Sequence, residues 1–239
     1  MTMTTTSAPE TSLGNPFDQL VWRSLSSNHA SLSQSRPLCK RYDPNVAPFG
    51  ALEHQSAEAV ASLAELMDPG QEVCLIDQKA DLPDRFELLS NSKVCQMLHD
   101  GRRNSMQKGD PVIRKLQRID VPHMLKLIAL VFPGYFRAET HKMGDYFGIF
   151  ENGNLVSMAG ERMSVPGHRE ISSICTHTEH RGNGYAARLT QFLIDTHSSY
   201  GMQSFLHVGQ QNASAKALYE KLGFSTSNIV EVNLYRRLM

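Results

Sequence analysis

The sequence has no excess of charge of either sign and few cysteines. Lys and Arg total 24, as do Asp and Glu, so the formal net charge is zero. A general nucleic-acid-binding protein usually carries a basic excess, so we expect no nucleic-acid partner, although a local basic site for a small anion remains open. The four cysteines have no zinc-type spacing, and a chain of 239 residues does not need disulfides for stability. We therefore expect free thiols and a cytoplasmic location.

Long apolar runs and targeting signals are also missing. The longest apolar stretch, Met124–Phe132, is interrupted by Lys126 and is too short to span a bilayer. The first twelve residues are polar and rich in threonine, without the basic and apolar regions of a signal peptide. We expect residues 1–15 to be a flexible tail and no membrane to be a partner. The hydrophobic fraction of 41% nevertheless suffices for a core.

A polar segment with a basic cluster, Asp100–Asp110, divides the chain into two parts. Residues 16–105 combine helix and strand patterns and predict an N-terminal α/β domain, either a degenerate copy of the C-terminal fold or a cap that shapes the substrate site. Residues 111–239 are expected to form the second domain. Within it, Tyr146–Ala159 predicts a hairpin around the turn Asn152-Gly153. The fold class is mixed α/β, or α+β.

The most informative stretch is Arg181-Gly182-Asn183-Gly184-Tyr185-Ala186. It lies between a strand pattern, Glu170–Thr176, and a helix pattern that reaches about Tyr200. The first N–H groups of a helix have no partner within the helix, and the helix dipole is positive there. Two glycines also let a ligand approach the backbone closely. The order of strand, glycine turn and helix therefore predicts a site for a phosphate-bearing ligand.

A second motif follows a strand pattern at Ser204–Val208. It is Asn212–Phe224, a helix pattern with Asn212 or Ser214 at its start, Tyr219 inside it and Gly223 at its end. Together the two motifs resemble the general N-acetyltransferase (GNAT) superfamily. Its acetyl-CoA motif, Arg or Gln, two residues, Gly, one residue, and Gly or Ala, corresponds to Arg181–Ala186. Its later Asn, Tyr and Gly-Phe signature corresponds to Asn212–Phe224.

The resemblance covers Pro111–Met239 and implies a twisted mixed sheet, flanked by helices, whose strands Glu170–Thr176 and Ser204–Val208 splay apart. It implies acetyl-CoA as co-substrate, no metal, and a pantetheine arm that enters the gap between these strands. Backbone contacts to the arm are then expected from Ile174, Cys175 and Thr176. Contacts to the pyrophosphate are expected from Gly182, Asn183, Gly184, Tyr185, Ala186 and Ala187. Arg181 is a further candidate for a contact to phosphate, with a solvated arginine at the start of the helix as the alternative. Asn212 is a candidate for a contact to the pantetheine arm or a bound water, with a plain helix cap as the alternative.

The resemblance also implies direct transfer of an acetyl group to a primary amine in a ternary complex. Tyr219 is the candidate acid, because a phenol with a pKa of about 10 stays protonated at neutral pH; a core tyrosine is the alternative. Glu170, which by strand alternation shares a face with Thr176, and Glu161, in the preceding strand, are candidate bases acting directly or through a water. Each is alternatively a solvated strand-end carboxylate. A backbone N–H near Thr176 is the expected oxyanion donor.

Other interpretations remain open. A non-catalytic acyl-CoA-binding sensor is the main alternative, against which the presence of Asn212 and Tyr219 argues. A dinucleotide-binding oxidoreductase would need Gly-x-Gly-x-x-Gly, but position 187 is alanine. His177 and His180 are three residues apart without a third ligand at suitable spacing, so they do not predict a metal site. The acceptor, a small-molecule amine or a peptide, and association into a homodimer are not readable from the sequence.

Overall fold

The computed structural model describes residues 15, 17–102, 111–131 and 134–239. In these ranges the strands form one eleven-stranded sheet in the order β1-β2-β3-β4-β11-β5-β10-β9-β8-β7-β6. Neighbouring strands are antiparallel except in the pairs β3–β4 and β9–β10, which are parallel. The expected mixed α/β class is confirmed. The tail expected at residues 1–15 lies, apart from Asn15, outside the described residues.

The elements of the N-terminal half are α1 (Leu20–Leu25), η1 (Ala30–Leu32), β1 (Ser33–Arg36), β2 (Cys39–Tyr42), β3 (Phe49–Leu52), α2 (Ala57–Leu66), β4 (Glu72–Ile76) and β5 (Phe86–His99). The elements of the C-terminal half are β6 (Arg114–Lys115), η2 (Arg118–Asp120), α3 (Val121–Val131), η3 (Thr140–Met143), β7 (Tyr146–Glu151), β8 (Asn154–Val165), β9 (His168–Thr176), η4 (Thr178–His180), α4 (Tyr185–Ser199), β10 (Gln203–Gly209), α5 (Ala213–Lys221) and β11 (Phe224–Arg237). The predicted hairpin is confirmed, because Asn152 and Gly153 both have positive φ in the turn between β7 and β8.

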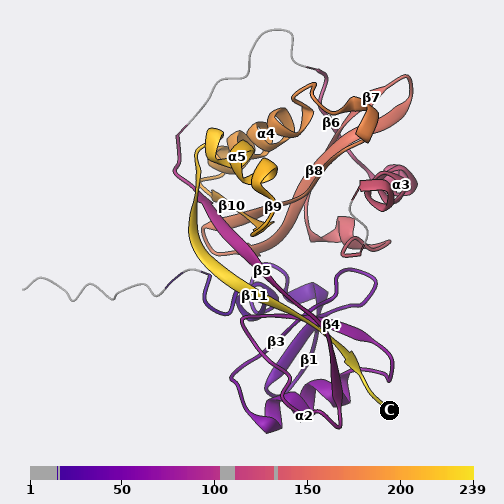
Figure 1. Ribbon diagram of the computed structural model, residues 1–239, viewed down its shortest axis with the longest axis vertical. Helices are drawn as coiled ribbons and strands as arrows, with labels where there is room; N and C mark the ends of the chain where they lie inside the picture. The colour runs from indigo at the N-terminus through magenta and orange to yellow at the C-terminus, as the bar shows by residue number, and fades with distance from the viewer. Residues whose placement is uncertain (1–14, 16, 103–110, 132–133) are drawn as a thin grey trace, which may run out of the picture.

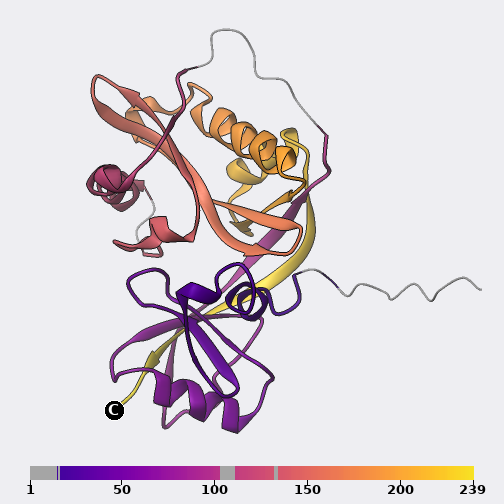
Figure 2. The ribbon, with the colours of Figure 1, turned by 180° about the vertical axis from the view of Figure 1, so that it is seen from behind.

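Two long strands, β5 and β11, run through both halves of the molecule (Figure 1). β5 pairs with β11 along its length and also with β10 of the C-terminal half, whereas β11 pairs with β4 of the N-terminal half. The chain therefore ends beside the N-terminal half, as Figure 2 shows from behind. The domain division expected between residues 105 and 111 stays a prediction, but each half contributes its last strand to the other.

Strands β1–β4 and strands β7–β10 have the same arrangement in the sheet. In the N-terminal half β1, β2 and β3 are antiparallel neighbours, and β3 connects through α2 to the parallel strand β4. In the C-terminal half β7, β8 and β9 are antiparallel, and β9 connects through α4 to the parallel strand β10. This correspondence supports the proposal that the N-terminal half is a degenerate copy of the C-terminal fold.

The starts of α2 and α4 differ in what they offer an anion. The side chain of Ser56 accepts a hydrogen bond from Ala59 N, and Glu58 places a carboxylate in the first turn of α2. Both features discourage a bound anion, because one donor is already used and the negative charge repels a second. In contrast α4 starts after Gly184 with no side-chain cap and no acidic residue in its first turn. Of these two helices, α4 alone has a start suited to phosphate.

Helices cover both faces of the C-terminal part of the sheet, with α3 opposite α4 and α5 (Figure 1). Strand alternation explains this, since Phe147 packs with Leu189 of α4 whereas its neighbour Tyr146 packs with Met124 of α3. A further core cluster joins the two halves: the rings of Phe17 and Phe205 lie 4.7 Å apart between centroids. The N-terminal half thus shares its core with β8 and β10.

Candidate functional site

β9 and β10 separate after only three residue pairs. Phe205 lies opposite Glu170 at the last of them, and beyond it the two strands continue to Gly209 and Thr176 without pairing with each other. The predicted splay is confirmed. β9 also has a bulge in this region. Cys175 pairs with Met158 of β8 and Ser172 pairs with Gly160, so β9 has one more residue than β8 between these two pairs. Ser173 within the bulge has a φ of 53°, and such a bulge bends a strand.

A cleft of about 1050 Å³ opens in this gap. Its walls on the C-terminal side come from β9, β10, the loop after β10 and α5, with the residues Ile171–Ile174, His207–Asn212, Ala215 and Tyr219. Its opposite wall comes mainly from β3, β4, β5 and β11. The unpaired edge of β9 faces this space, so backbone N–H and C=O groups are available to an extended ligand.

The glycine turn lies at the carboxyl end of β9 and is exposed. Gly182 and Gly184 have φ values of 84° and 74°, and a Cβ at either position would meet no atom within 4 Å. The hydrogen-bond ladder of α4 starts with Arg188 N–H donating to Gly184 O at 3.1 Å, so the N–H groups of residues 185–187 precede it. The side chains of Asn183 and Arg188 brace the turn through bonds to His180 O and Asn183 O.

Tyr219 lies on α5 and lines the cleft. Its side chain is 7% exposed, and burial raises the pKa of its hydroxyl to about 12. The ring packs edge-on against Phe224, but the hydroxyl donates no hydrogen bond to any described residue. Asn212 caps α5 by accepting from Ala215 N at 3.1 Å, as the sequence predicts. The ring of Tyr219 thus packs in the core, and the same residue also lines the cleft.

Glu170 is fully buried and does not line the cleft itself. Its carboxylate accepts from Arg162 Nε at 2.9 Å, from Met163 N at 3.1 Å and from His207 Nδ1 at 2.6 Å. Burial alone would raise the pKa of Glu170, but Arg162 and His207 outweigh it and hold the pKa well below its usual range. Arg162 and His207 both line the cleft, so Glu170 reaches that space only through them.

The ionised state of Glu170 fixes the hydrogen on His207. A carboxylate can only accept, so Nδ1 of His207 carries a hydrogen. Nε2 lies 3.0 Å from the side-chain amide nitrogen of Gln96. In the neutral ring Nε2 would then hold the lone pair that a general base uses, and a substrate or water would replace Gln96 there.

Glu161 has a different environment. It is buried on β8 and accepts from Asp145 N at 2.9 Å, from Arg169 at 2.9 Å and from His197 Nε2 at 3.1 Å. Burial acts to raise the pKa of Glu161, but His197, Asp145 N and Arg169 together lower it. Glu161 is not among the residues that line the cleft. Neither predicted base is a solvated strand-end carboxylate.

Of the remaining predicted residues, some line the cleft and others do not. Ile174 lines the cleft, and Arg181 is exposed beside the glycine turn. Cys175 is buried, and burial raises the pKa of its thiol to about 12, so it is a packing residue. Thr176 Oγ1 lies 2.9 Å from Ser157 Oγ on β8. The expectation that Glu170 shares a face with Thr176 assumed regular alternation, which the bulge at Ser173 interrupts.

Arg162 and the wall from the N-terminal half have no local signal in the sequence.

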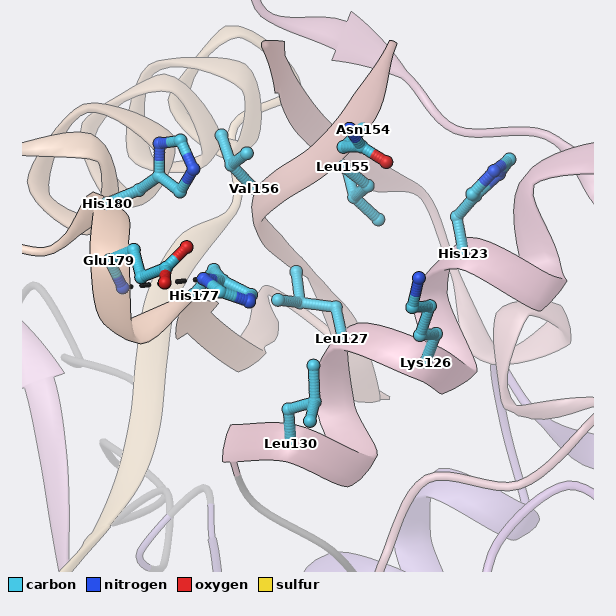
Figure 3. Close-up of a pocket in the computed structure, with 10 residues that line it drawn as sticks. All are labelled: His123, Lys126, Leu127, Leu130, Asn154, Leu155, Val156, His177, Glu179 and His180. Carbon is cyan, nitrogen blue, oxygen red and sulfur yellow. Dashed lines mark hydrogen bonds between the residues drawn. The ribbon is translucent and has the colours of Figure 1, made fainter. Parts of the chain in front are cut away.

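A smaller pocket of about 180 Å³ lies beside η4, where Leu127 points from α3 toward His177 (Figure 3). The rings of His177 and His180 lie 5.7 Å apart, and His180 Nδ1 lies 3.1 Å from Glu151. Throughout the described ranges no three His, Cys, Asp or Glu side chains gather as a metal site would require. In the same ranges no helix is long and apolar enough to cross a membrane.

Comparisons with known proteins agree with this geometry. The family described as FR47-like protein matches residues 146–232. A GNAT-family protein from Novosphingobium aromaticivorans is 34% identical over 94% of this chain and 100% of its own, with a TM-score of 0.86. GCN5-related proteins from Kribbella flavida (15% identity, 91% and 95% covered, TM-score 0.59) and Streptococcus suis (16%, 95% and 94%, 0.58) share the fold. No curated protein matches the chain significantly.

Proposed function

The chain belongs to the GNAT superfamily, and on that premise we propose that it is an N-acetyltransferase which moves an acetyl group from acetyl-CoA to a primary amine. The observation that carries the proposal is the open gap between β9 and β10, with the glycine turn after β9 and Tyr219 of α5 lining the cleft in that gap. The first motif follows β9, and the second, which begins 31 residues after Arg181, lines the cleft with Asn212 and Tyr219.

The residues present fit acetyl-CoA. The N–H groups at the start of α4 and the space above Gly182 and Gly184 suit a diphosphate, and we propose that the exposed Arg181 adds a positive charge. The unpaired edge of β9, including Ile174, Cys175 and Thr176, suits the amides of a pantetheine arm. When bound, acetyl-CoA supplies an acyl group activated as a thioester. Asn212 would contribute its free amide nitrogen at the opposite side of the arm.

The proposed reaction is a direct transfer in a ternary complex. The nitrogen of the acceptor amine attacks the thioester carbonyl carbon, so a C–N bond forms and the C–S bond breaks. A backbone N–H of β9 near Thr176 would stabilise the oxyanion. The leaving sulfur receives its hydrogen bond or proton from the Tyr219 hydroxyl, which burial keeps protonated at all ordinary pH values.

The amine must also lose a proton, and the placement of the carboxylates favours Glu170 over Glu161 as the group that assists. We propose that His207 Nε2 accepts the proton, directly or through a water, after Gln96 gives up its hydrogen bond. Glu170 holds Nδ1 and stabilises the imidazolium that results. Glu170 is then a positioning residue, and the base is a side chain that reaches the cleft.

The test is release of free thiol from acetyl-CoA across a panel of amines, for the wild type and for Tyr219→Phe. We expect at least one amine to stimulate release, and the variant to be slower. If no amine stimulates release while acetyl-CoA still binds tightly, the protein is a non-catalytic acyl-CoA sensor. Binding of nicotinamide cofactors in preference to acetyl-CoA would contradict both interpretations.

A further inference from the structure

The wall of the cleft opposite α5 combines polar residues of β5, Asn91 and Ser92, with an apolar and aromatic part. The apolar part includes Phe49 of β3, Ile76 of β4 and Val232 of β11, together with Tyr135 and Ile128. Ile76 and Val232 are direct cross-strand partners, so their side chains lie side by side. The rings of Phe49 and Tyr135 stack at a centroid distance of 6.0 Å and an angle of 10°. This wall belongs mostly to the N-terminal half and to the end of β11 that pairs with it.

The same cleft offers no carboxylate to an incoming ammonium group. Among its described lining residues there is no Asp or Glu, and the charged side chains are Lys93 and Arg162. Glu170, behind Arg162, is fully buried and its charge is balanced by that guanidinium. The guanidinium carbon also lies 4.9 Å from the centroid of the Phe49 ring. The part of the cleft next to this wall is therefore apolar, and the charged side chains that line the cleft are positive.

We infer, building on the proposed function, that the acceptor is an amine carried on one apolar body of aromatic size, without a second cationic group. The body packs against the stacked rings and the Ile76–Val232 pair, where burial of apolar surface is favourable. A polyamine would instead bring further ammonium groups beside Arg162 and Lys93 with no carboxylate to pair them. An apolar environment also favours the neutral form of the reacting amine, which is the form that attacks.

The wild-type protein tests this with three amines: 2-phenylethylamine, L-phenylalanine and spermidine. Thiol release from acetyl-CoA gives kcat/KM for each, and calorimetry measures binding of each amine to the protein loaded with coenzyme A. We expect 2-phenylethylamine to exceed spermidine by at least about tenfold in both measurements. L-Phenylalanine differs from 2-phenylethylamine by a carboxylate, which Arg162 or Lys93 would pair. Comparing these two amines therefore shows whether the acceptor carries a carboxylate.

The possible failures are distinguishable. If spermidine binds or reacts better than both aromatic amines, the acceptor inference is overturned while the proposed function stands. If no amine reacts although acetyl-CoA binds, the proposed function fails, and the calorimetric ranking still decides the inference about the wall.

A gain-of-function variant tests the charge argument separately. Ile76→Glu places a carboxylate in the wall and is expected to shift the preference toward spermidine by about tenfold. Ile229→Glu, the same substitution at a half-exposed position of β11 outside the cleft lining, is the matched control and leaves the preference unchanged. An unchanged preference in a folded Ile76→Glu protein overturns the inference. Val232→Glu makes the same test if Ile76→Glu does not fold.

Discussion

Replacing Tyr219 by phenylalanine removes one hydroxyl from the cleft and leaves the aromatic ring in place. The ring keeps its packing against Phe224 and the surrounding core cluster. The hydroxyl donates no hydrogen bond within the described residues, so its removal leaves no other group unsatisfied. Because deleting a buried polar group without a partner is nearly neutral or stabilising, we expect little change in the thermal unfolding midpoint.

The size of the kinetic effect follows from the pKa of Tyr219, which burial raises to about 12. A thiol has a pKa of about 8.5, so complete proton transfer from this phenol to a thiolate is uphill by roughly 3.5 units, or ~5 kcal/mol. The phenol would therefore act mainly by donating a hydrogen bond to the leaving sulfur. A hydrogen bond to a charged group contributes about 1.5–3 kcal/mol. We expect kcat to fall by roughly 10- to 150-fold.

The assay is steady-state thiol release with saturating amine, read together with a thermal melt of each protein. KM for acetyl-CoA should change little, because the hydroxyl acts on the leaving group and not on the diphosphate. Since the phenol titrates at about 12, the wild-type rate should show no falling limb from Tyr219 up to pH 10. A kcat within about twofold of wild type would refute the role of Tyr219, as would a loss that follows the melting temperature.

Three further predictions follow from other parts of the structure. His207→Gln should lower kcat near neutral pH by about 10²–10⁴-fold, and the pH–rate profile should show recovery toward the amine's own pKa of about 10. Without that recovery His207 has only a structural role. Gly184→Val should raise KM for acetyl-CoA and destabilise the protein by about 1–2 kcal/mol, because φ is 74° there. Gly201→Val, at a φ of 70° beyond the other end of α4, should show the strain without the KM effect, and equal KM values would contradict the anion site. Burial lowers the pKa of His29 to about 4, so between pH 6.5 and 4 the unfolded chain binds a proton that the fold does not. The free energy of unfolding should drop over that interval by up to ~3 kcal/mol, and His29→Gln should make the slope shallower in urea titrations; an identical slope would exclude His29 as the cause.

The local features of the site follow directly from short segments of sequence. Gly182 and Gly184 have the positive φ expected of a glycine turn, and Asn212 caps α5 as its position predicts. The turn at Asn152-Gly153 also forms as expected. Each of these depends on backbone geometry within a few residues, which residue type and spacing determine.

The features that the sequence did not reveal depend on contacts between distant segments. β5 and β11 pair over residues separated by more than a hundred positions, which no local pattern marks. The burial of Glu170 depends on Arg162 and His207, from two other strands. In the sequence such a carboxylate resembles an exposed charge at the end of a strand, because its partners become its neighbours only when the sheet assembles.

A crystal structure of the protein with coenzyme A bound is the measurement that tests the central claim most directly. We predict that the diphosphate oxygens lie within about 3.2 Å of backbone N–H groups in residues 182–187. The pantetheine arm should follow the unpaired edge of β9, and the thiol should lie beside the hydroxyl of Tyr219. Coenzyme A bound outside the gap between β9 and β10, or a thiol remote from Tyr219, would contradict the account.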